Sequence, residues 1–188
     1  PYTRSLLSAI PGSSSPAPAS LERVTLNGTP PNPRHPPAGC PFSTRCPAKI
    51  RPEGYGNVDE EVWDAIERFR EVVRERSRIS IGAVGRVKRE LGRFSAFDDI
   101  DETVEEFFGD LDVPPTVEQH IQEAADLVKD GHPMQAREHL SEQFSSVCDR
   151  DRPEFYPVTE TNRMSYCHRH SQEYEDIDPV ISRRTSDD

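Results

Sequence analysis

The sequence predicts a mainly α protein. A proline-rich extended arm with a short strand and a cysteine-rich loop region are expected to flank an inserted four- or five-helix unit. Twelve of the 18 prolines fall at or before Pro52, and proline fixes φ and removes a backbone donor. Residues 58–147 instead carry apolar side chains at three- and four-residue steps, which is typical of amphipathic helices. The four cysteines lie outside this stretch, two on each side, so the chain is expected to leave the cysteine-rich region, form a bundle and return.

The first 28 residues contain two expected elements joined by a loop. Residues 1–10 are predicted to form a short helix with its apolar side chains on one face, which ends at Pro11. The run PGSSSPAPAS at residues 11–20 is typical of a surface loop. Within residues 21–28, Val24 and Leu26 alternate with Thr25 and an Asn-Gly turn signal follows, which predicts a short strand.

The helical stretch begins with the strongest pattern in the chain. In residues 59–76 the apolar side chains recur on one face, and Glu, Asp and Arg fill the positions between them. Residues 81–91 keep helical spacing, but glycines weaken the pattern. Asp99 is expected to cap a further helix that stops near Gly109.

Two more helices complete the predicted unit. Thr116 and Gln119 have the spacing of a capping box, which predicts a helix that opens there and continues to Asp130-Gly131. The last helix begins near Pro133 and runs through Phe144. Short loops between these helices favour a packed bundle.

The predicted organisation has four parts. Residues 1–57 contain the helix, the strand and the Cys40/Cys46 loop, and residues 58–147 form the helical insertion. Residues 148–170 are the returning cysteine segment. Residues 171–188 are acidic and lack periodicity, so we expect a flexible tail.

Charge excludes one broad class of partner. The formal net charge is −11, and such a surface repels the phosphates of nucleic acids. Twenty of the 23 basic residues are arginine, and excess acid with few lysines suits a chain that stays soluble in high salt. No run approaches eighteen consecutive apolar residues, so we expect no direct insertion into a membrane.

No residue of the chain is predicted to be catalytic. The sequence contains no GxxxxGK[ST] phosphate loop, no GxGxxG turn, no HExxH helix and no GxSxG elbow. No Asp/Glu pair stands out from the general acidity.

The cysteines are the positive signal. Cys40 and Cys46 are separated by five residues in GCPFSTRCP, and Cys148 and Cys167 by eighteen. Four thiolates close a tetrahedral zinc site or hold an iron–sulfur cube. Paired zinc ligands usually have about two to four residues between them, so the five-residue gap disfavours zinc. Two alternatives stay open: four reduced, partly buried thiols, or a Cys40–Cys46 disulfide in an oxidising compartment.

Four residues near these features have two readings each. Trp63 is expected to be a core residue rather than a binding platform. His168 and His170, beside Cys167, are candidate substitute ligands but are expected to face solvent. Arg45 is expected either to neutralise the charge of a cluster or to pair with an acid on the surface.

Residues 1–50 resemble the C-terminal extension of the ATP-binding subunits of oligopeptide and dipeptide ABC transporters. The resemblance rests on PYTRSLLSAIPG and on the pattern PxPxxPPxGCxFxxRCP, which this chain fulfils up to Pro47. SVCDRDRPEFYPV resembles the third-cysteine segment of the family, and YCHR resembles its closing cysteine. About a hundred residues lie between the second and third cysteines here, which implies an insertion into the cysteine-rich loop.

The resemblance implies a function for the complete subunit. It would hydrolyse ATP with Mg²⁺ on an upstream core to drive peptide uptake, together with a partner ATP-binding subunit and membrane permease subunits. It would lie in the cytoplasm, peripheral on the inner face of the cell membrane. The family places a histidine just before PYT, so Pro1 is expected to follow a longer segment.

For this segment, the resemblance implies a [4Fe–4S] cluster on Cys40, Cys46, Cys148 and Cys167, with a structural role. The alternative is a stand-alone metal-binding or helical protein-interaction module.

Overall fold

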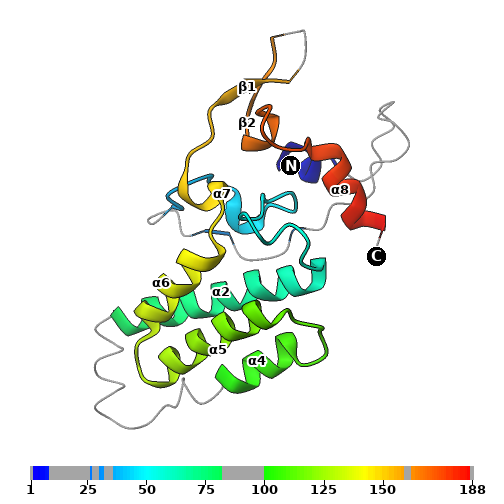
Figure 1. Cartoon of the computed structure of the whole chain (residues 1–188). Coiled ribbons are helices and arrows are strands. Elements are labelled where there is room, and N and C mark those ends of the chain that lie inside the picture. The colour runs from blue at the N-terminus through cyan, green and yellow to red at the C-terminus, as the bar shows by residue number, and fades with distance from the viewer. Residues whose placement is uncertain are drawn as a thin grey trace. The chain divides into compact units, whose positions relative to one another are not determined.

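The computed structural model describes residues 2–8, 26, 30–31, 36–81, 100–158 and 162–186. The chain divides into two compact units. We call Pro1–Glu53 together with Ser146–Asp188 the cysteine unit, and Gly54–Ser145 the helical unit. Over the described residues the fold is mainly helical, as predicted, and it contains a small two-stranded sheet that was not predicted (Figure 1). The loop expected at 11–20 lies outside the described residues, as does nearly all of the strand expected at 21–28 and of the helical pattern expected at 81–91.

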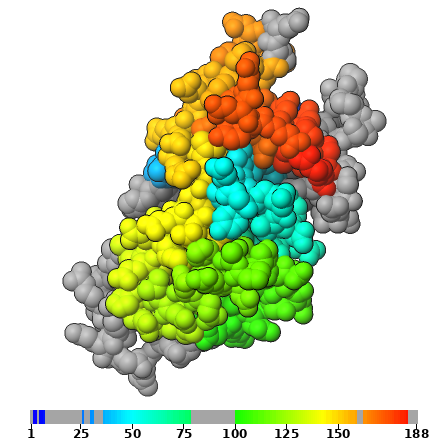
Figure 2. All heavy atoms as spheres, viewed as in Figure 1, coloured from blue at the N-terminus to red at the C-terminus, as the bar shows by residue number. Residues whose placement is uncertain are grey.

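Four described helices form the helical unit. They are α2 (Glu60–Ile81), α4 (Ile100–Phe108), α5 (Pro115–Lys129) and α6 (Pro133–Phe144). Helix α2 contacts α4 and α6, and α5 contacts the same two helices, so the four enclose a common centre. Helices α5 and α6 also pack against each other, and their atoms adjoin on the face seen in Figure 2. The predicted helical insertion therefore has a core of its own.

The core of the helical unit follows from the apolar periodicity of its helices. Trp63, as expected, is a core residue, only 2% exposed. Its ring meets that of Phe144 edge-on at 6.4 Å between centroids, an arrangement that aromatic pairs favour. The fully buried large side chains of this unit are Trp63, Ile66, Phe69, Val73, Ile100, Val117, Val128, Leu140 and Phe144.

The capping box predicted at Thr116 and Gln119 is wrong. Helix α5 starts earlier, at Pro115, and its N-cap residue, Pro114, makes no side-chain capping bond. Proline suits the first helical position because its missing N–H has no partner there and its φ is already helical. The C-terminal end of α5 lies at Asp130-Gly131, as expected. Gly131 adopts φ +80°, a conformation that ends the helix before α6 begins.

The cysteine unit is built from short elements. They are α1 (Tyr2–Ser8), the 3-10 turn η1 (Ser43–Arg45), α7 (Val147–Arg150), β1 (Phe155–Pro157), β2 (Met164–Tyr166), the 3-10 turn η2 (His168–His170) and α8 (Ile177–Ser186). Strands β1 and β2 are antiparallel, with Phe155 opposite Tyr166. Among the described helices, none combines the length and apolar character that crossing a bilayer requires.

The flexible tail predicted for residues 171–188 is wrong over much of its length. Helix α8 covers Ile177–Ser186. Ile177 and Ile181, four residues apart on one helix face, are buried against Ala48. Two apolar side chains sufficed to order this segment, although they are too few to produce a recognisable period in an acidic sequence.

Candidate metal centre

The first two cysteines lie at the ends of a compact turn. The backbone N–H of Ser43 donates to the carbonyl of Cys40 at 3.0 Å, and that of Arg45 donates to Phe42 at 3.1 Å, which forms η1. After Cys46, the N–H of Lys49 returns to the Cys46 carbonyl at 3.2 Å. Each of these two cysteines is followed by a proline, which takes the second position of the hydrogen-bonded turn, where its fixed φ is favourable.

Two backbone hydrogen bonds join this loop to the third cysteine. The N–H of Cys40 donates to the carbonyl of Cys148 at 2.9 Å, and the N–H of Gly39 donates to that of Asp149 at 3.1 Å. A Cβ on Gly39 would lie 2.5 Å from the Cys148 oxygen. Only glycine allows this approach, so the Gly-Cys pair of the loop is a docking point for α7.

A capping box holds Cys148 in place. Ser146 is the N-cap of α7, and its Oγ accepts a hydrogen bond from the N–H of Cys148 at 3.2 Å. The N–H of Ser146 donates to the carboxylate of Asp149 at 3.1 Å. These reciprocal bonds satisfy donors that a short helix would otherwise leave unpaired. The sequence does contain this signal, S-x-x-D, but the capping box was predicted elsewhere.

Cys167 comes directly after the β1–β2 hairpin in the sequence. It follows β2, precedes η2 and packs with Cys46 against the small core of Ala48, Ile177 and Ile181. The Arg169 guanidinium donates to the carbonyls of Ala48 and Lys49 and to that of Glu175. The Arg169 side chain therefore connects the segment of Cys167 to the residues that follow Cys46.

All four predicted ligands therefore belong to one unit and influence one another electrostatically. The pKa of Cys46 is raised to about 12, mainly by burial, with smaller contributions from the neighbouring Cys148 and Cys167. Burial also raises the pKa values of Cys40 and Cys148. Cys167 contributes to raising both, and Cys40 contributes to raising that of Cys148. Neutral thiols are thus favoured without a metal, and a bound cation would reverse that preference.

Hydrogen-bond donors already face the sulfurs. The backbone N–H groups of Phe42 and Ser43 lower the pKa of Cys40, that of Ala48 lowers the pKa of Cys46, and that of Ile50 lowers the pKa of Cys148, although burial outweighs each effect. Donors aimed at thiolates are what a cysteine-ligated iron–sulfur cluster requires.

Positive charge surrounds the same thiols. Lys49, whose side chain is 7% exposed, lies 2.9 Å from the Asp149 carboxylate and lowers the pKa of Cys148. Burial lowers the pKa of Arg169, whereas Cys46, Cys148 and Cys167 raise it. The buried Lys49 side chain and the partly buried Arg169 both offset the negative charge that thiolates bring.

Buried hydroxyls in the turn between Cys40 and Cys46 also bear on whether an anionic group would fit beside the thiols. Among the described residues, Ser43 Oγ and Thr44 Oγ1 are buried without a hydrogen-bond partner. A buried hydroxyl costs free energy of folding unless an acceptor takes its hydrogen bond. Arg45 Nε, between the same cysteines, is also buried without a partner in the described part of the chain. The donor set fits an anionic sulfur group.

The sulfurs are spaced too widely for a preformed zinc site. In the described chain, no three of the four sulfurs lie within 4.8 Å of one another. A tetrahedral zinc ion with Zn–S bonds of about 2.3 Å would hold them roughly 3.8 Å apart. An iron–sulfur cube separates its thiolates more, because each sulfur binds a different iron.

The expectation that His168 and His170 face solvent is wrong for His168. Its ring is buried, and its Nε2 lies 2.9 Å from the carbonyl of Asp151. His170 is partly buried, and its Nδ1 lies 3.5 Å from Asp176. Burial lowers the pKa of His170, and Asp176 opposes that shift. His168 fastens η2 to the segment after α7, so its Nε2 is not available as a substitute ligand.

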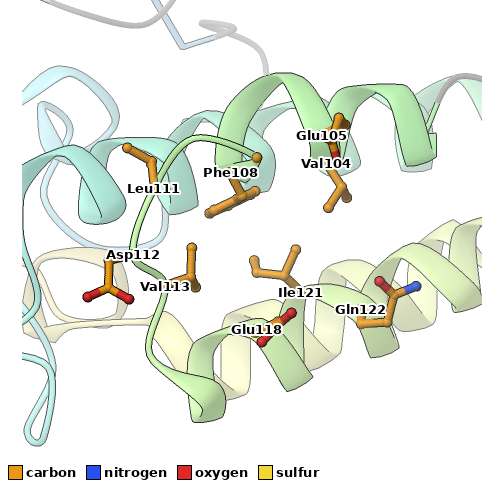
Figure 3. A pocket seen from close by; sticks show the side chains of 10 residues that line it. Val104, Glu105, Phe108, Leu111, Asp112, Val113, Glu118, Ile121 and Gln122 are labelled. Atoms are coloured by element: carbon orange, nitrogen blue, oxygen red, sulfur yellow. The ribbon is translucent and has the colours of Figure 1, made fainter.

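A pocket of about 390 Å³ lies in the helical unit between α4 and α5. Figure 3 shows Val104, Phe108, Val113 and Ile121 pointing into it from both sides. The carboxylates of Glu105, Asp112 and Glu118 are also part of its lining. None of the four cysteines lines it.

Two family models match the chain in succession. The model described as "Oligopeptide/dipeptide transporter, C-terminal region" matches residues 1–51, which include Cys40 and Cys46. The model described as "Domain of unknown function (DUF8228)" matches residues 60–161, which include Cys148. Cys167 lies beyond both matches. The transporter match is thus shorter than the resemblance, which extended to the two later cysteine segments.

Curated relatives match the same first part. A putative peptide import ATP-binding protein of Brucella ovis is 59% identical over 51 residues, which are 27% of this chain and 15% of that protein. The oligopeptide transport ATP-binding protein AppF of Bacillus subtilis is 47% identical over 47 residues, 25% of this chain and 14% of that protein. The di/tripeptide transport ATP-binding protein DppF of Pseudomonas aeruginosa is 51% identical over 47 residues, with the same coverage.

The chain thus spans about one-seventh of the length of the curated relatives it matches. No solved structure matches it.

Proposed function

The chain belongs to the family of the domain of unknown function DUF8228, and its first 51 residues match the oligopeptide/dipeptide transporter C-terminal region. From the second match we propose that the chain is the C-terminal accessory segment of the ATP-binding subunit of a peptide ABC importer. The observation that carries the proposal is the 59% identity over 51 residues to a putative peptide import ATP-binding protein. The complete subunit couples ATP hydrolysis to peptide uptake, with ATP and Mg²⁺ on its ATPase core. This segment is non-catalytic.

An exposed apolar face supports docking on that core. Helix α1 leaves Tyr2, Leu6 and Leu7 each more than half exposed. The ring of Tyr2 meets Phe42 edge-on at 5.4 Å, which connects α1 to the cysteine turn. Exposed large apolar side chains gathered on one short helix mark an interaction site. The occupant we assign is the ATPase core, since the relatives are about seven times longer than the region they share with this chain.

The proposed function implies a location in the cell for the segment. Because the core works beneath the permease subunits, the segment lies at the cytoplasmic face of the membrane, peripheral to it. Its partners are the core of the same subunit, the partner ATP-binding subunit and the permeases.

Co-purification tests this assignment. The tagged full chain is co-expressed with the ATP-binding and permease subunits of the peptide importer from the same genome, and the captured subunits are identified by mass spectrometry. We expect the importer subunits to be retained, and to be lost in the double variant Leu6→Glu/Leu7→Glu. The control Met134→Glu alters an equally exposed apolar side chain, 52% exposed, on the helical unit. Retention of no importer subunit by the unaltered chain would refute the proposal and favour a module without a transporter role.

For the cysteine unit we propose a [4Fe–4S] cluster on Cys40, Cys46, Cys148 and Cys167. The amide donors, the two cations and the unpaired hydroxyls around the sulfurs support this choice. When bound, the cluster supplies four metal–thiolate bonds that cross-link distant parts of the chain. Lys49 and Arg169 balance its negative charge. The hydroxyls of Ser43 and Thr44, which otherwise have no hydrogen-bond partner, would be available to donate hydrogen bonds to it.

The role of the cluster in this proposal is structural. The cysteine unit consists of short helices, turns and a two-stranded sheet, with a buried apolar cluster of three residues, Ala48, Ile177 and Ile181. So small a core supplies little stability, and small units usually need a metal or a cross-link.

Anaerobic purification with analysis of iron, sulfide and zinc tests the cluster. We expect a brown protein with about four irons per chain and absorbance near ~400 nm. A colourless protein with no iron, whose cysteine unit survives chelation, would contradict the cluster but leave the importer assignment standing.

A further inference from the structure

Three ligand-type side chains meet on a helical hairpin away from the cysteines. His120 and Glu123 lie three residues apart on one face of α5, and His139 lies on α6, which follows after a short loop. Residues three apart on a helix are neighbours, so both α5 side chains face the same partner. The two imidazole rings are 5.2 Å apart between centroids.

The ligand atoms are already close together. Glu123 Oε2 is 3.3 Å from His139 Nε2 and 4.0 Å from His120 Nδ1, and all three atoms lie within 4.8 Å of one another. A zinc ion with bonds of about 2.0–2.1 Å to nitrogen and oxygen holds tetrahedral ligands roughly 3.4 Å apart. The widest separation must therefore close by up to about 1.4 Å, a movement that the side chains share.

Both ring nitrogens lack hydrogen bonds. Within the described residues, His120 Nδ1 and His139 Nε2 are buried and make no hydrogen bond, despite the nearby carboxylate. An unpaired buried nitrogen is costly unless it has a partner. An ion between the two rings and the carboxylate would satisfy both nitrogens at once.

Neighbouring side chains hold the three groups in position. The side-chain amide of Gln119 donates to Glu123 Oε1 at 2.8 Å, which leaves Oε2 to face the imidazoles. The edge of Phe144 fixes the His120 ring, with centroids 5.9 Å apart. Partners that orient ligands in this way are a regular part of metal sites. Glu123 is 47% exposed, so an ion has a route in.

We propose that His120, Glu123 and His139 bind a divalent transition-metal ion, with Zn²⁺ as the best fit and a fourth position open to water. Two imidazoles and one carboxylate are the ligand set of open zinc sites, and hard cations such as Mg²⁺ prefer oxygen ligands. The site lies wholly in the helical unit and is independent of the cysteines. The sequence alone does not reveal the site, because H-x-x-E is common on polar helices and His139 joins it only through the hairpin.

Imidazole NMR tests the site without interference from the thiols. The reduced, ¹⁵N-labelled full chain is titrated with ZnSO₄, and the ring nitrogens are followed in two-bond ¹H–¹⁵N spectra. We expect the signals of His120 Nδ1 and His139 Nε2 to shift together along one saturating curve, whatever zinc the thiols also take up. His132→Asn is the matched control, since His132 is exposed in the same unit.

Two variants decide the outcome. We expect Glu123→Gln and His139→Asn each to weaken zinc binding at the remaining histidine by at least about 10-fold, since even outer-shell partners contribute about 10–100-fold. His132→Asn should leave it unchanged. Trp63 fluorescence, from the core of the same unit, verifies that each variant is folded. Unshifted signals at both histidines, or equal affinity in all three variants, would overturn the proposal.

Discussion

Substituting Gly39 by alanine tests how the cysteine unit is joined. The added Cβ would lie 2.5 Å from the Cys148 carbonyl oxygen and 2.7–2.8 Å from the Asp149 carbonyl group. All three are backbone atoms, so no side chain can rotate out of the way. An ordinary contact is at least 3.4 Å, so the two segments must separate by about 0.9 Å.

That separation breaks both backbone bonds of the junction. Their present lengths are 2.9 Å for Cys40 to Cys148 and 3.1 Å for Gly39 to Asp149, and either would exceed the hydrogen-bonding range. Each bond contributes about 0.5–1.5 kcal/mol, so the pair contributes about 1–3 kcal/mol, and buried groups left unpaired add to the loss. Opening of the junction should become about 5–150-fold more frequent.

Amide hydrogen exchange in the full chain measures this opening. We expect the Cys40 amide of Gly39→Ala to exchange faster by that factor, while amides of α5 and α6 keep their protection. Gly56→Ala is the matched control, because nothing lies within 4 Å of its Cβ position. An unchanged exchange rate at Cys40 would show that the glycine contact does not hold the two cysteine segments together.

Three further perturbations address the two cores and the thiols. Ile181→Ala removes a side chain that is 1% exposed and should destabilise α8 by about 2–5 kcal/mol, detected as earlier proteolysis after Arg183; resistance equal to the unaltered chain would argue against the docked helix. Phe144→Ala should cost the helical unit about 3–5 kcal/mol, measured by urea unfolding followed at Trp63; a loss below ~1 kcal/mol would show that its ring contacts are weak. In the reduced, metal-free chain, burial keeps Cys46 protonated up to a pKa of about 12, whereas the unfolded thiol ionises near 9.0. Unfolding therefore releases a proton at pH values between these two pKa values, and the free energy of unfolding should fall as the pH rises from about 9 to 12. A free energy that stays flat or rises over this range, or that falls equally in Cys46→Ser, would contradict the buried thiol.

The helices could be predicted because their cores repeat along the sequence. Val62, Ile66, Phe69 and Val73 recur at helical spacing, and each is buried in α2. The start of α5 was misplaced because a Thr-x-x-Gln pattern and a Pro-Pro pair compete within three residues, and proline geometry prevailed.

The cysteine residues could be selected from the sequence, but their surroundings could not. The bonds from Gly39 and Cys40 to α7 join positions more than a hundred residues apart, and no local pattern encodes such a pairing. Arg169 was not selected for the same reason, since its acceptors are carbonyls near residue 48. The β1–β2 hairpin escaped prediction because three-residue strands are too short to show alternation.

Native mass spectrometry of the anaerobically isolated chain tests most directly whether the four cysteines act as one site. We expect a single added mass of about 350 Da, that of four irons and four sulfides. The serine variants of Cys40, Cys46, Cys148 and Cys167 should each lose it, because each thiolate binds one iron of the cube. An unaltered chain that carries no added mass, or a serine variant that keeps it, would contradict the shared site.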